Sequence, residues 1–190
     1  MDLTQTSSYF KLRCSACPSC CRTVRVPLTD ADLGRLVVTT QLHAEKVIDW
    51  LAPTDIDMSG EPESFVETNV GRRIVMLRHE NDACMFLSDG GYCNVYASRP
   101  AACASYPLAL VNRNGSPVLE PLPDAPCVLA QREFQRVGIY DSALGAAHRV
   151  EVELSNYWVK VSAWNLRQRR RKLLGHMPRR SSSFLQFLGF

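Results

Sequence analysis

Hydrophobic residues recur at helical spacing in the first third of the chain. A helix is predicted to begin after Thr29, because threonine caps helix N-termini and Asp30 and Asp32 suit the positive end of the helix dipole. A second helix is expected over about residues 40–51, where apolar residues continue at helical spacing until a proline follows. Residues 53–64 are polar and predict a loop.

Extended patterns predominate in the middle of the chain. Residues 24–28 predict a short strand, and the apolar run within residues 73–78 predicts another. A β-hairpin is expected over residues 84–96. A second is expected over residues 108–119, because the dipeptide Asn114-Gly115 is typical of tight hairpin turns.

Helical spacing returns in the last third of the chain. One helix is predicted from beyond Cys127 to about His148, and another from about Val150 to Leu174, with an apolar face that includes several aromatic residues. The chain beyond Pro178 is expected to be loose.

The composition is that of an ordinary globular protein. The 190 residues are 46% hydrophobic and 22% charged, and no apolar run approaches the roughly 18 residues that a membrane span needs. The first eleven residues lack the pattern of a secretory signal, so we expect a cytoplasmic location, where thiols stay reduced.

Eight cysteines form the most informative pattern of the chain. Two consecutive C-x-x steps near the N-terminus direct several sulfurs at one small volume, as a thiolate metal site requires. The spacing therefore predicts metal ligation rather than a disulfide framework, which belongs to short secreted chains. The predicted ligands are Cys14, Cys17, Cys20, Cys21, Cys84, Cys93, Cys103 and Cys127.

The division of these cysteines among sites stays open. Side chains of adjacent residues tend to point apart, so Cys20 and Cys21 are expected to serve different sites, or one of them none. One possible set combines Cys14, Cys17 and Cys20 with a remote cysteine, and another combines Cys21 with three downstream cysteines. The fold we predict is a small single α+β domain with short β-hairpins and several helices, its loops held by one or two thiolate metal sites. Residues 1–150 would be the metal-binding domain, and residues 151–190 a basic C-terminal helix and tail.

Two residues beside the cysteines have alternative interpretations. Arg99, made extended by Pro100, would offset the negative charge of metal-bound thiolates, or it is a surface charge next to a turn. His79 would be a mixed ligand, or an ordinary surface or core histidine. Asp82 and Asp89 are interpreted as turn residues rather than acid–base catalysts.

The charge of the chain is unevenly distributed. The net charge is +3, but the residues from 150 onward contain eight basic and two acidic residues. The run Arg167–Lys172, near Trp158 and Trp164, would bind an anionic partner such as a nucleic acid or a membrane surface. The alternative is a solvated helix end whose cations favour the negative end of the helix dipole.

These motifs together resemble a known family, the YkgJ-like CxxCxxCC cysteine-cluster family, described as zinc- or iron-chelating. The resemblance spans about residues 14–127. It rests on Cys14-x-x-Cys17-x-x-Cys20-Cys21, Cys84-Met-Phe-Leu and Cys93-x-x-Tyr96-x-x-Arg99-Pro100-x-x-Cys103-x-x-Tyr106-Pro107. A related cysteine cluster in flagellin lysine N-methylase is associated with an iron–sulfur cluster, which implies that option here. Methyl transfer is not implied, since the chain has no glycine-rich nucleotide loop.

The first functional hypothesis is an iron–sulfur protein, with a [4Fe–4S] cluster used in electron transfer, redox sensing or cluster-assisted chemistry. The alternative is a structural zinc module that supports interaction with a protein or nucleic acid. Metal chelation or storage, with labile binding, is a third. The sequence assigns no substrate, no catalytic residue and no reaction.

Overall fold

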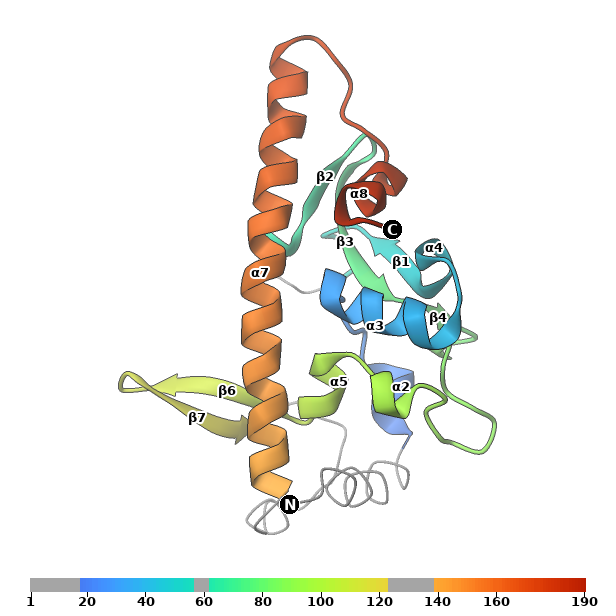
Figure 1. Cartoon of the computed structure of the whole chain (residues 1–190), viewed down its shortest axis with the longest axis vertical. Helices are drawn as coiled ribbons and strands as arrows, with labels where there is room; N and C mark the ends of the chain where they lie inside the picture. The colour runs from blue at the N-terminus through green and yellow to red at the C-terminus, as the bar shows by residue number, and fades with distance from the viewer. Residues whose placement is uncertain (1–17, 57–61, 123–138) are drawn as a thin grey trace. The chain divides into compact units, whose positions relative to one another are not determined.

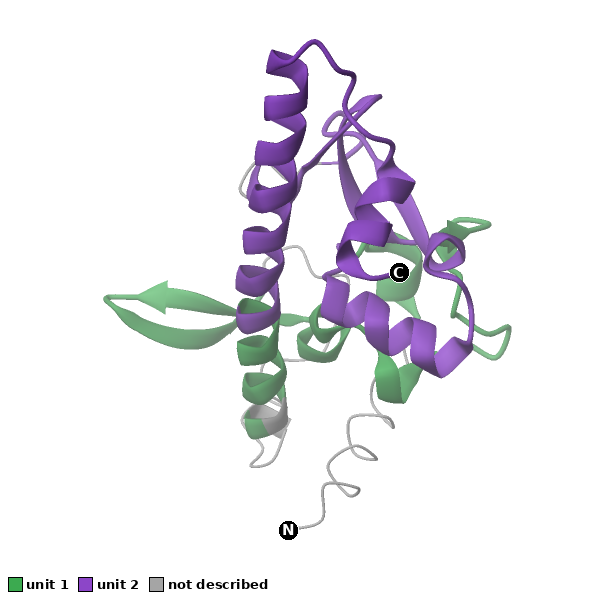
Figure 2. Ribbon diagram, turned by 45° about the horizontal axis from the view of Figure 1, so that its top comes forward, with its two compact units in different colours: residues 1–26, 79–151 green, residues 27–78, 152–190 purple. Residues whose placement is uncertain are grey.

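The structure of the protein is a computed structural model that describes residues 18–56, 62–122 and 139–190. The described residues form two compact units (Figure 2). Unit 1 contains residues 18–26, 79–122 and 139–151, and unit 2 contains residues 27–56, 62–78 and 152–190. Helices and small antiparallel sheets make up both, which confirms the predicted α+β class (Figure 1).

Unit 2 is built on a three-stranded antiparallel sheet in the order β1-β3-β2. Its strands are β1 (Ile48–Leu51), β2 (Val66–Thr68) and β3 (Gly71–Leu77). The central strand is the apolar run predicted from the sequence. Because its four residues from Ile74 to Leu77 are all buried, it needs partners on both edges and cover on both faces.

The single helix predicted over residues 40–51 is wrong except at its centre, because residues 41–43 are not helical and residues 48–51 form a strand. Helix α4 is only Ala44–Val47, and the chain then enters β1, which pairs residue for residue with β3 from Ile48↔Leu77 to Leu51↔Ile74. The Arg78 side chain fixes this change of structure, because its Nη2 donates to the carbonyls of Glu45 (2.9 Å) and Ile48 (2.8 Å). Pairing with a buried strand outweighs a local helical pattern.

The helix predicted after Thr29 is present as α3 (Asp30–Thr40). Thr29 and Asp32 form a capping box, in which the Thr29 hydroxyl accepts from the Asp32 amide at 3.1 Å and the Asp32 carboxylate accepts from the Thr29 amide at 3.1 Å. The buried face of α3 carries Leu33 and Leu36.

The two helices predicted on either side of residue 149 are one helix, α7 (Ile139–Leu173). Gly145 does not interrupt it, because the glycine is exposed while Ala143, Ala146 and Ala147 around it are buried and favour helix. The part of α7 up to Glu151 belongs to unit 1 and the part from Val152 to unit 2. The predicted helical residues 128–138 lie outside the described residues.

The prediction of a loose tail beyond Pro178 is wrong. Helix α8 (Ser181–Leu188) buries Phe184 completely in unit 2. The Phe184 ring makes edge contacts with Trp50, Tyr157 and Trp164, with ring centroids 5.4 to 6.3 Å apart. A short apolar segment thus becomes ordered because it completes an aromatic core.

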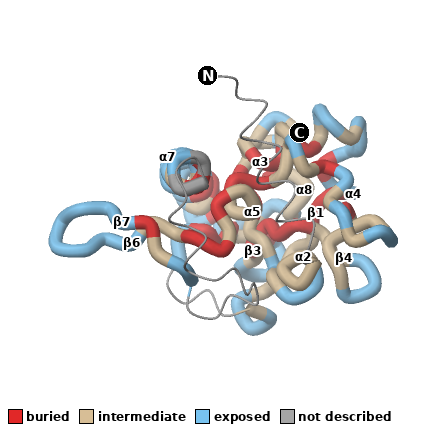
Figure 3. Tube along the Cα trace, turned by 90° about the horizontal axis from the view of Figure 1, so that it is seen from below, coloured by how far each residue is buried: buried red, intermediate tan, exposed pale blue. Residues whose placement is uncertain are grey.

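Unit 1 contains several short elements besides the start of α7. They are α2 (Ser19–Thr23), β4 (His79–Glu80), β5 (Ala83–Cys84), α5 (Ala101–Ser105), β6 (Leu108–Arg113) and β7 (Ser116–Pro121). The β6–β7 hairpin confirms the prediction, and Asn114 and Gly115 both adopt positive φ in its turn, as a type I′ turn requires. Its base packs Leu108 and Leu119 on Ala143 and Ala147 of α7, while its tip is exposed (Figure 3).

Two predicted extended segments are reduced to single β-bridges within the described residues. The strand expected over residues 24–28 pairs at Pro27↔Met76 only, and the hairpin expected over residues 84–96 pairs at Leu87↔Cys93 only. The second segment is instead a loop, followed by a 3-10 turn at Tyr96–Ser98. In unit 2, a similar 3-10 turn at Pro62–Ser64 precedes β2.

Candidate metal centre

Helix α2 holds two of the predicted ligands side by side. Cys20 and Cys21 are both half-buried, and a hydrogen bond between their side chains raises the pKa of Cys20, with burial adding to this effect. The two thiols therefore approach each other, whereas the sequence argument expected neighbouring side chains to point apart. Within unit 1, α2 lies against β5, the strand that carries Cys84.

Cys84 ends β5, where the chain turns back on itself. The Leu87 amide donates to the Cys84 carbonyl at 2.9 Å, and the amides of Phe86 and Leu87 also hydrogen-bond to the Cys84 sulfur. These two donors lower the pKa of Cys84, but burial outweighs them and the pKa is raised. Amides directed at a cysteine sulfur stabilise a thiolate, the form that binds metal.

Cys93 lies on the returning arm of the same loop. The bridge Leu87↔Cys93 and the hydrogen bond from the Asn94 amide to the Phe86 carbonyl (2.9 Å) hold the two arms together. Gly91 closes the loop with φ +79°, and its amide donates to the Ser88 carbonyl at 2.9 Å, which confirms the predicted turn.

The sulfur of Cys93 has an environment like that of Cys84. Burial raises its pKa, while a hydrogen bond from the Val95 amide and the positive charge of Arg99 act in the opposite direction.

Three cysteines from separate segments thus come within electrostatic range of one another. Negative charge on Cys20 raises the pKa of both Cys84 and Cys93, and charge on Cys93 raises that of Cys84. Helix α2 supplies the first sulfur, and the two arms of the 84–93 loop supply the others. Cys20 precedes Cys84 and Cys93 by more than sixty positions in the sequence, and the fold brings it close to them.

The positive charge of Arg99 acts on Cys93, one of these three cysteines. Its guanidinium stacks on the Tyr96 ring, 3.9 Å from the centroid, and Nη1 donates to the Tyr96 carbonyl at 2.6 Å. Since its charge lowers the pKa of Cys93, the interpretation that Arg99 offsets thiolate charge is favoured over that of an isolated surface charge. Pro100, fully buried, follows at the N-cap of α5, and that helix carries the half-buried Cys103.

His79, for which the sequence left open a mixed ligand or an ordinary histidine, is placed beside one of the cysteines. It lies directly opposite Cys84 in the β4–β5 pair. Residues 81 and 82 form the two-residue turn between these strands, and both adopt positive φ. Asparagine and aspartate tolerate this backbone conformation, and the turn confirms the interpretation of Asp82 as a turn residue.

The ligand set as a whole is not contained in the described residues. Cys14, Cys17 and Cys127 lie outside them. Among the residues that the structure describes, no three His, Cys, Asp or Glu side chains are arranged to hold a metal ion. The assignment of all eight cysteines as ligands therefore stays a prediction.

The basic run Arg167–Lys172 forms the end of α7 in unit 2. The tryptophans near it serve the interior of that unit, because Trp158 Nε1 donates to Ser64 Oγ and Trp164 Nε1 to the Glu67 carbonyl, each at 2.8 Å. Trp164 is also buried. Both indole N–H groups are therefore used inside unit 2, and the buried Trp164 has no open face on which a nucleic-acid base would stack.

Half-buried cysteines with amide donors directed at their sulfurs are an environment in which metal-binding proteins stabilise thiolates. Residues 13–138 match the CxxCxxCC family, described as "Putative zinc- or iron-chelating domain", and the chain belongs to this family. The family description supports metal binding without deciding between zinc and iron. Comparison with curated proteins and with solved structures finds no match to the chain. No helix in the described part of the chain is long and apolar enough to cross a membrane.

Proposed function

We propose that the protein holds an iron–sulfur cluster of the [4Fe–4S] type and uses it in electron transfer or redox sensing. Such a cluster takes four cysteine ligands, so we assign the eight cysteines to one or two such sites, and the metal-binding function to residues 1–150. Such a cluster would supply one-electron redox chemistry when bound. A reducing compartment suits the thiolate ligands, so we place the protein in the cytoplasm.

One observation carries the proposal: three cysteines from separate segments lie within electrostatic range, and backbone amides hydrogen-bond to the sulfurs of Cys84 and Cys93. Hydrogen bonds to sulfur and partial burial are the features by which a protein adjusts the reduction potential of an iron–sulfur cluster. The charge of Arg99 adds to them, since thiolate-bound clusters are anionic.

A second candidate, a structural zinc site, is favoured by the position of His79. Residues directly opposite each other in an antiparallel pair project from the same face of the sheet. Because His79 is the partner of Cys84 in register, a mixed cysteine–histidine set is available at this point, and such sets are typical of structural zinc.

The deciding experiment is anaerobic purification of the full chain, followed by a visible spectrum and quantitation of iron, acid-labile sulfide and zinc in the same sample. We expect a brown protein with matched iron and sulfide that bleaches on reduction with dithionite. A colourless protein with stoichiometric zinc would contradict the iron–sulfur proposal and support the structural one.

Variants connect the metal content to the cluster of thiols. Cys84→Ser is expected to lower the bound iron at least several-fold. Ala83→Ser is the matched control, because it introduces the same hydroxyl one residue earlier and keeps every cysteine. Equal metal content in the two variants would exclude Cys84 as a ligand.

A further inference from the structure

The turn between α7 and α8 in unit 2 combines dense positive charge with exposed aliphatic side chains. Residues 167–180 contain seven lysines and arginines and no acidic residue. Three large apolar side chains within the same segment are exposed to solvent: Leu173 (88% exposed), Leu174 (65%) and Met177 (71%). Figure 1 shows this turn at the end of α7, where the chain leads into α8.

The backbone holds this turn in one conformation. The amide of His176 donates to the Arg171 carbonyl (2.9 Å) and that of Gly175 to the Lys172 carbonyl (3.0 Å), the pair of bonds that defines a Schellman motif. Gly175 supplies the positive φ (+76°) that this motif requires. Arg171 Nε also donates to the Met177 carbonyl at 3.2 Å, which ties the outgoing chain to the helix.

The exposed apolar residues are therefore positioned by hydrogen bonds of the turn. They do not lie on the face of α7 that packs in unit 2, where Val161, Trp164 and Gln168 are buried. Packing of unit 2 therefore does not explain why these apolar side chains are exposed. We call the segment 167–180, with its cations and its exposed apolar residues, the basic tip.

Much of the positive charge at the tip is available to a partner. Lys172 pairs with Glu67 at 3.1 Å, and Arg167 lies over the Phe187 ring at 4.9 Å. Arg169 and Arg170 are exposed, and no salt bridge between described residues neutralises either of them. Arg179 and Arg180 add two exposed cations just after the turn.

We propose that this tip docks on the surface of an anionic lipid bilayer. Leu173, Leu174 and Met177 would enter the interfacial region, while the surrounding arginines contact the negatively charged headgroups. Aliphatic residues within a cluster of cations are the combination by which peripheral proteins bind membranes. No helix in the described residues crosses the bilayer, so the protein would lie on the surface.

Other partners suit the tip less well. A single-stranded nucleic acid would be expected to use exposed aromatic faces for stacking. The nearby aromatic residues are engaged inside unit 2, because Trp158 and Trp164 donate hydrogen bonds there and Arg167 covers the half-buried Phe187 ring. A second copy docking through the same patch would bring two acid-free cationic segments together, which like-charge repulsion opposes.

The test is co-sedimentation of the purified full chain with vesicles of 70% phosphatidylcholine and 30% phosphatidylserine, against vesicles of phosphatidylcholine alone. We expect binding to the anionic vesicles at least ten-fold tighter, and weakening several-fold when the salt concentration rises from 0.1 to 0.5 M. Each surface-bound Lys or Arg strengthens such binding by about five-fold.

Two double variants separate the contributions of charge and of apolar contact. Arg169→Glu with Arg170→Glu should weaken binding at least ten-fold, and Leu174→Ser with Met177→Ser several-fold. The matched controls reverse two exposed charges elsewhere (Lys46→Glu with Arg149→Glu) and replace two equally exposed valines (Val38→Ser with Val159→Ser). The controls should bind as the wild type does, and thermal unfolding by circular dichroism checks that every variant is folded.

Several outcomes would overturn the proposal. Equal binding to both kinds of vesicle would do so, as would wild-type binding by both tip variants. Binding of a single-stranded RNA without binding to vesicles would assign the tip to a nucleic acid. A protein that ignores vesicles but dimerises, and loses its dimer with Leu166→Ser, would assign the exposed heptad Val152, Val159, Leu166 and Leu173 of α7 to a second copy.

Discussion

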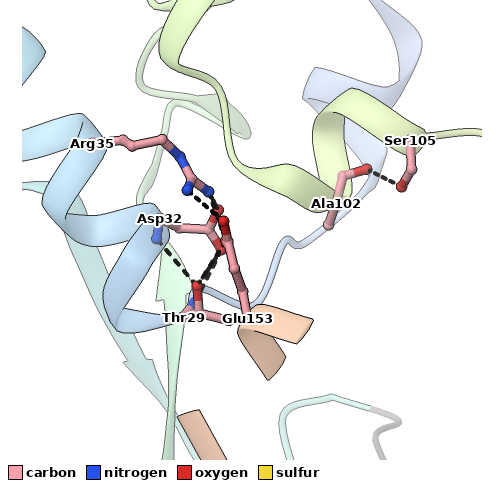
Figure 4. A network of polar contacts seen from close by, with 6 residues as sticks. All are labelled: Thr29, Asp32, Arg35, Ala102, Ser105 and Glu153. Atoms are coloured by element: carbon pink, nitrogen blue, oxygen red, sulfur yellow. Dashed lines mark hydrogen bonds and ion pairs between the residues drawn. The ribbon is translucent and has the colours of Figure 1, made fainter. Parts of the chain in front are cut away.

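Arg35 of α3 and Glu153 of α7 form a bidentate ion pair inside unit 2, although they are 118 residues apart in the chain. Arg35 Nη1 donates to Glu153 Oε1 at 2.6 Å and Nη2 to Oε2 at 2.8 Å, while Nη2 also reaches Asp32 Oδ1 at 2.5 Å (Figure 4). Asp32 belongs at the same time to the capping box of α3 with Thr29. The pair thus joins the first turns of α3 to α7 through directed, charge-assisted hydrogen bonds.

Replacement of one partner of this pair should destabilise the protein measurably. Glu153→Gln leaves the cation of Arg35 with only Asp32, so we expect the free energy of unfolding to fall by about 1–2 kcal/mol, less than for a fully buried pair because Arg35 is partly exposed to solvent. Urea denaturation measures this difference. Glu120→Gln removes the exposed pair Arg113–Glu120 of the β6–β7 hairpin and should leave the midpoint nearly unchanged. Equal effects of the two substitutions would contradict the structural role of Glu153.

Tyr157 should make the stability of the protein depend on alkaline pH. Its phenol is fully buried, and burial, with a contribution from the charge of Asp30, raises its pKa well above the ordinary value. A group with a raised pKa in the folded state stabilises the fold below its unfolded pKa and loses that contribution as the pH rises beyond it. We therefore expect the free energy of unfolding to decline above pH 10.

The variant Tyr157→Phe tests this directly. It should flatten the decline above pH 10. At neutral pH it should be neutral or stabilising by about 1 kcal/mol, because the buried hydroxyl has no hydrogen-bond partner among the described residues. Guanidinium denaturation at pH 7 and pH 11 gives both numbers. An identical slope with pH in variant and wild type would show that another group is responsible.

Substitution of Phe184 should destabilise the protein more than substitution at most other positions of unit 2. Its ring is fully buried and contacts three aromatic rings of β1 and α7, so Phe184→Ala should cost about 3–5 kcal/mol of unfolding free energy. Gln186→Ala is the control, because Gln186 is exposed on the same helix. If both variants melted at the wild-type temperature, the packing of α8 on this aromatic core would be contradicted.

Helix α8 also shows which elements of the fold can be predicted from the sequence and which cannot. Helix α3 and the β6–β7 hairpin were predictable because local signals, the Thr29 cap and Asn114-Gly115, decide them. Strand β1 and helix α8 were not, because each is ordered by distant partners, β1 by the buried strand β3 and α8 by three aromatic rings of β1 and α7. Tertiary contacts outweigh weak local propensities of this kind.

The candidate site shows the same limit. The C-x-x spacing identified the kind of chemistry, since it depends on sequence neighbours alone. The approach of Cys20 to Cys84 and Cys93 depends on α2 lying against β5, and nothing in the spacing predicts that contact. The amide donors to sulfur likewise arise from the path of the loop after each cysteine.

His79 should distinguish an all-cysteine ligand set from a mixed one. If the cluster is bound by cysteines only, His79→Asn should leave iron and sulfide content unchanged even though the residue faces Cys84 in register. His148→Asn, at an exposed position of α7, is the control for loss of a histidine. Iron and zinc quantitation of the three proteins measures the effect. Loss of metal in His79→Asn alone would place the histidine in the ligand set and favour zinc.

Arg99 should tune the reduction potential of a bound cluster through its charge. A positive charge stabilises the more negative, reduced state, so Arg99→Gln should lower the midpoint potential by roughly tens of millivolts. Arg99→Lys keeps the charge but loses the flat stacking on Tyr96, and it should stay near the wild-type potential. Potentiometric titration followed by electron paramagnetic resonance measures all three proteins. A drop of the same size in both variants would mean that Arg99 acts by holding the Tyr96 turn in place, because only the stacking is lost in both.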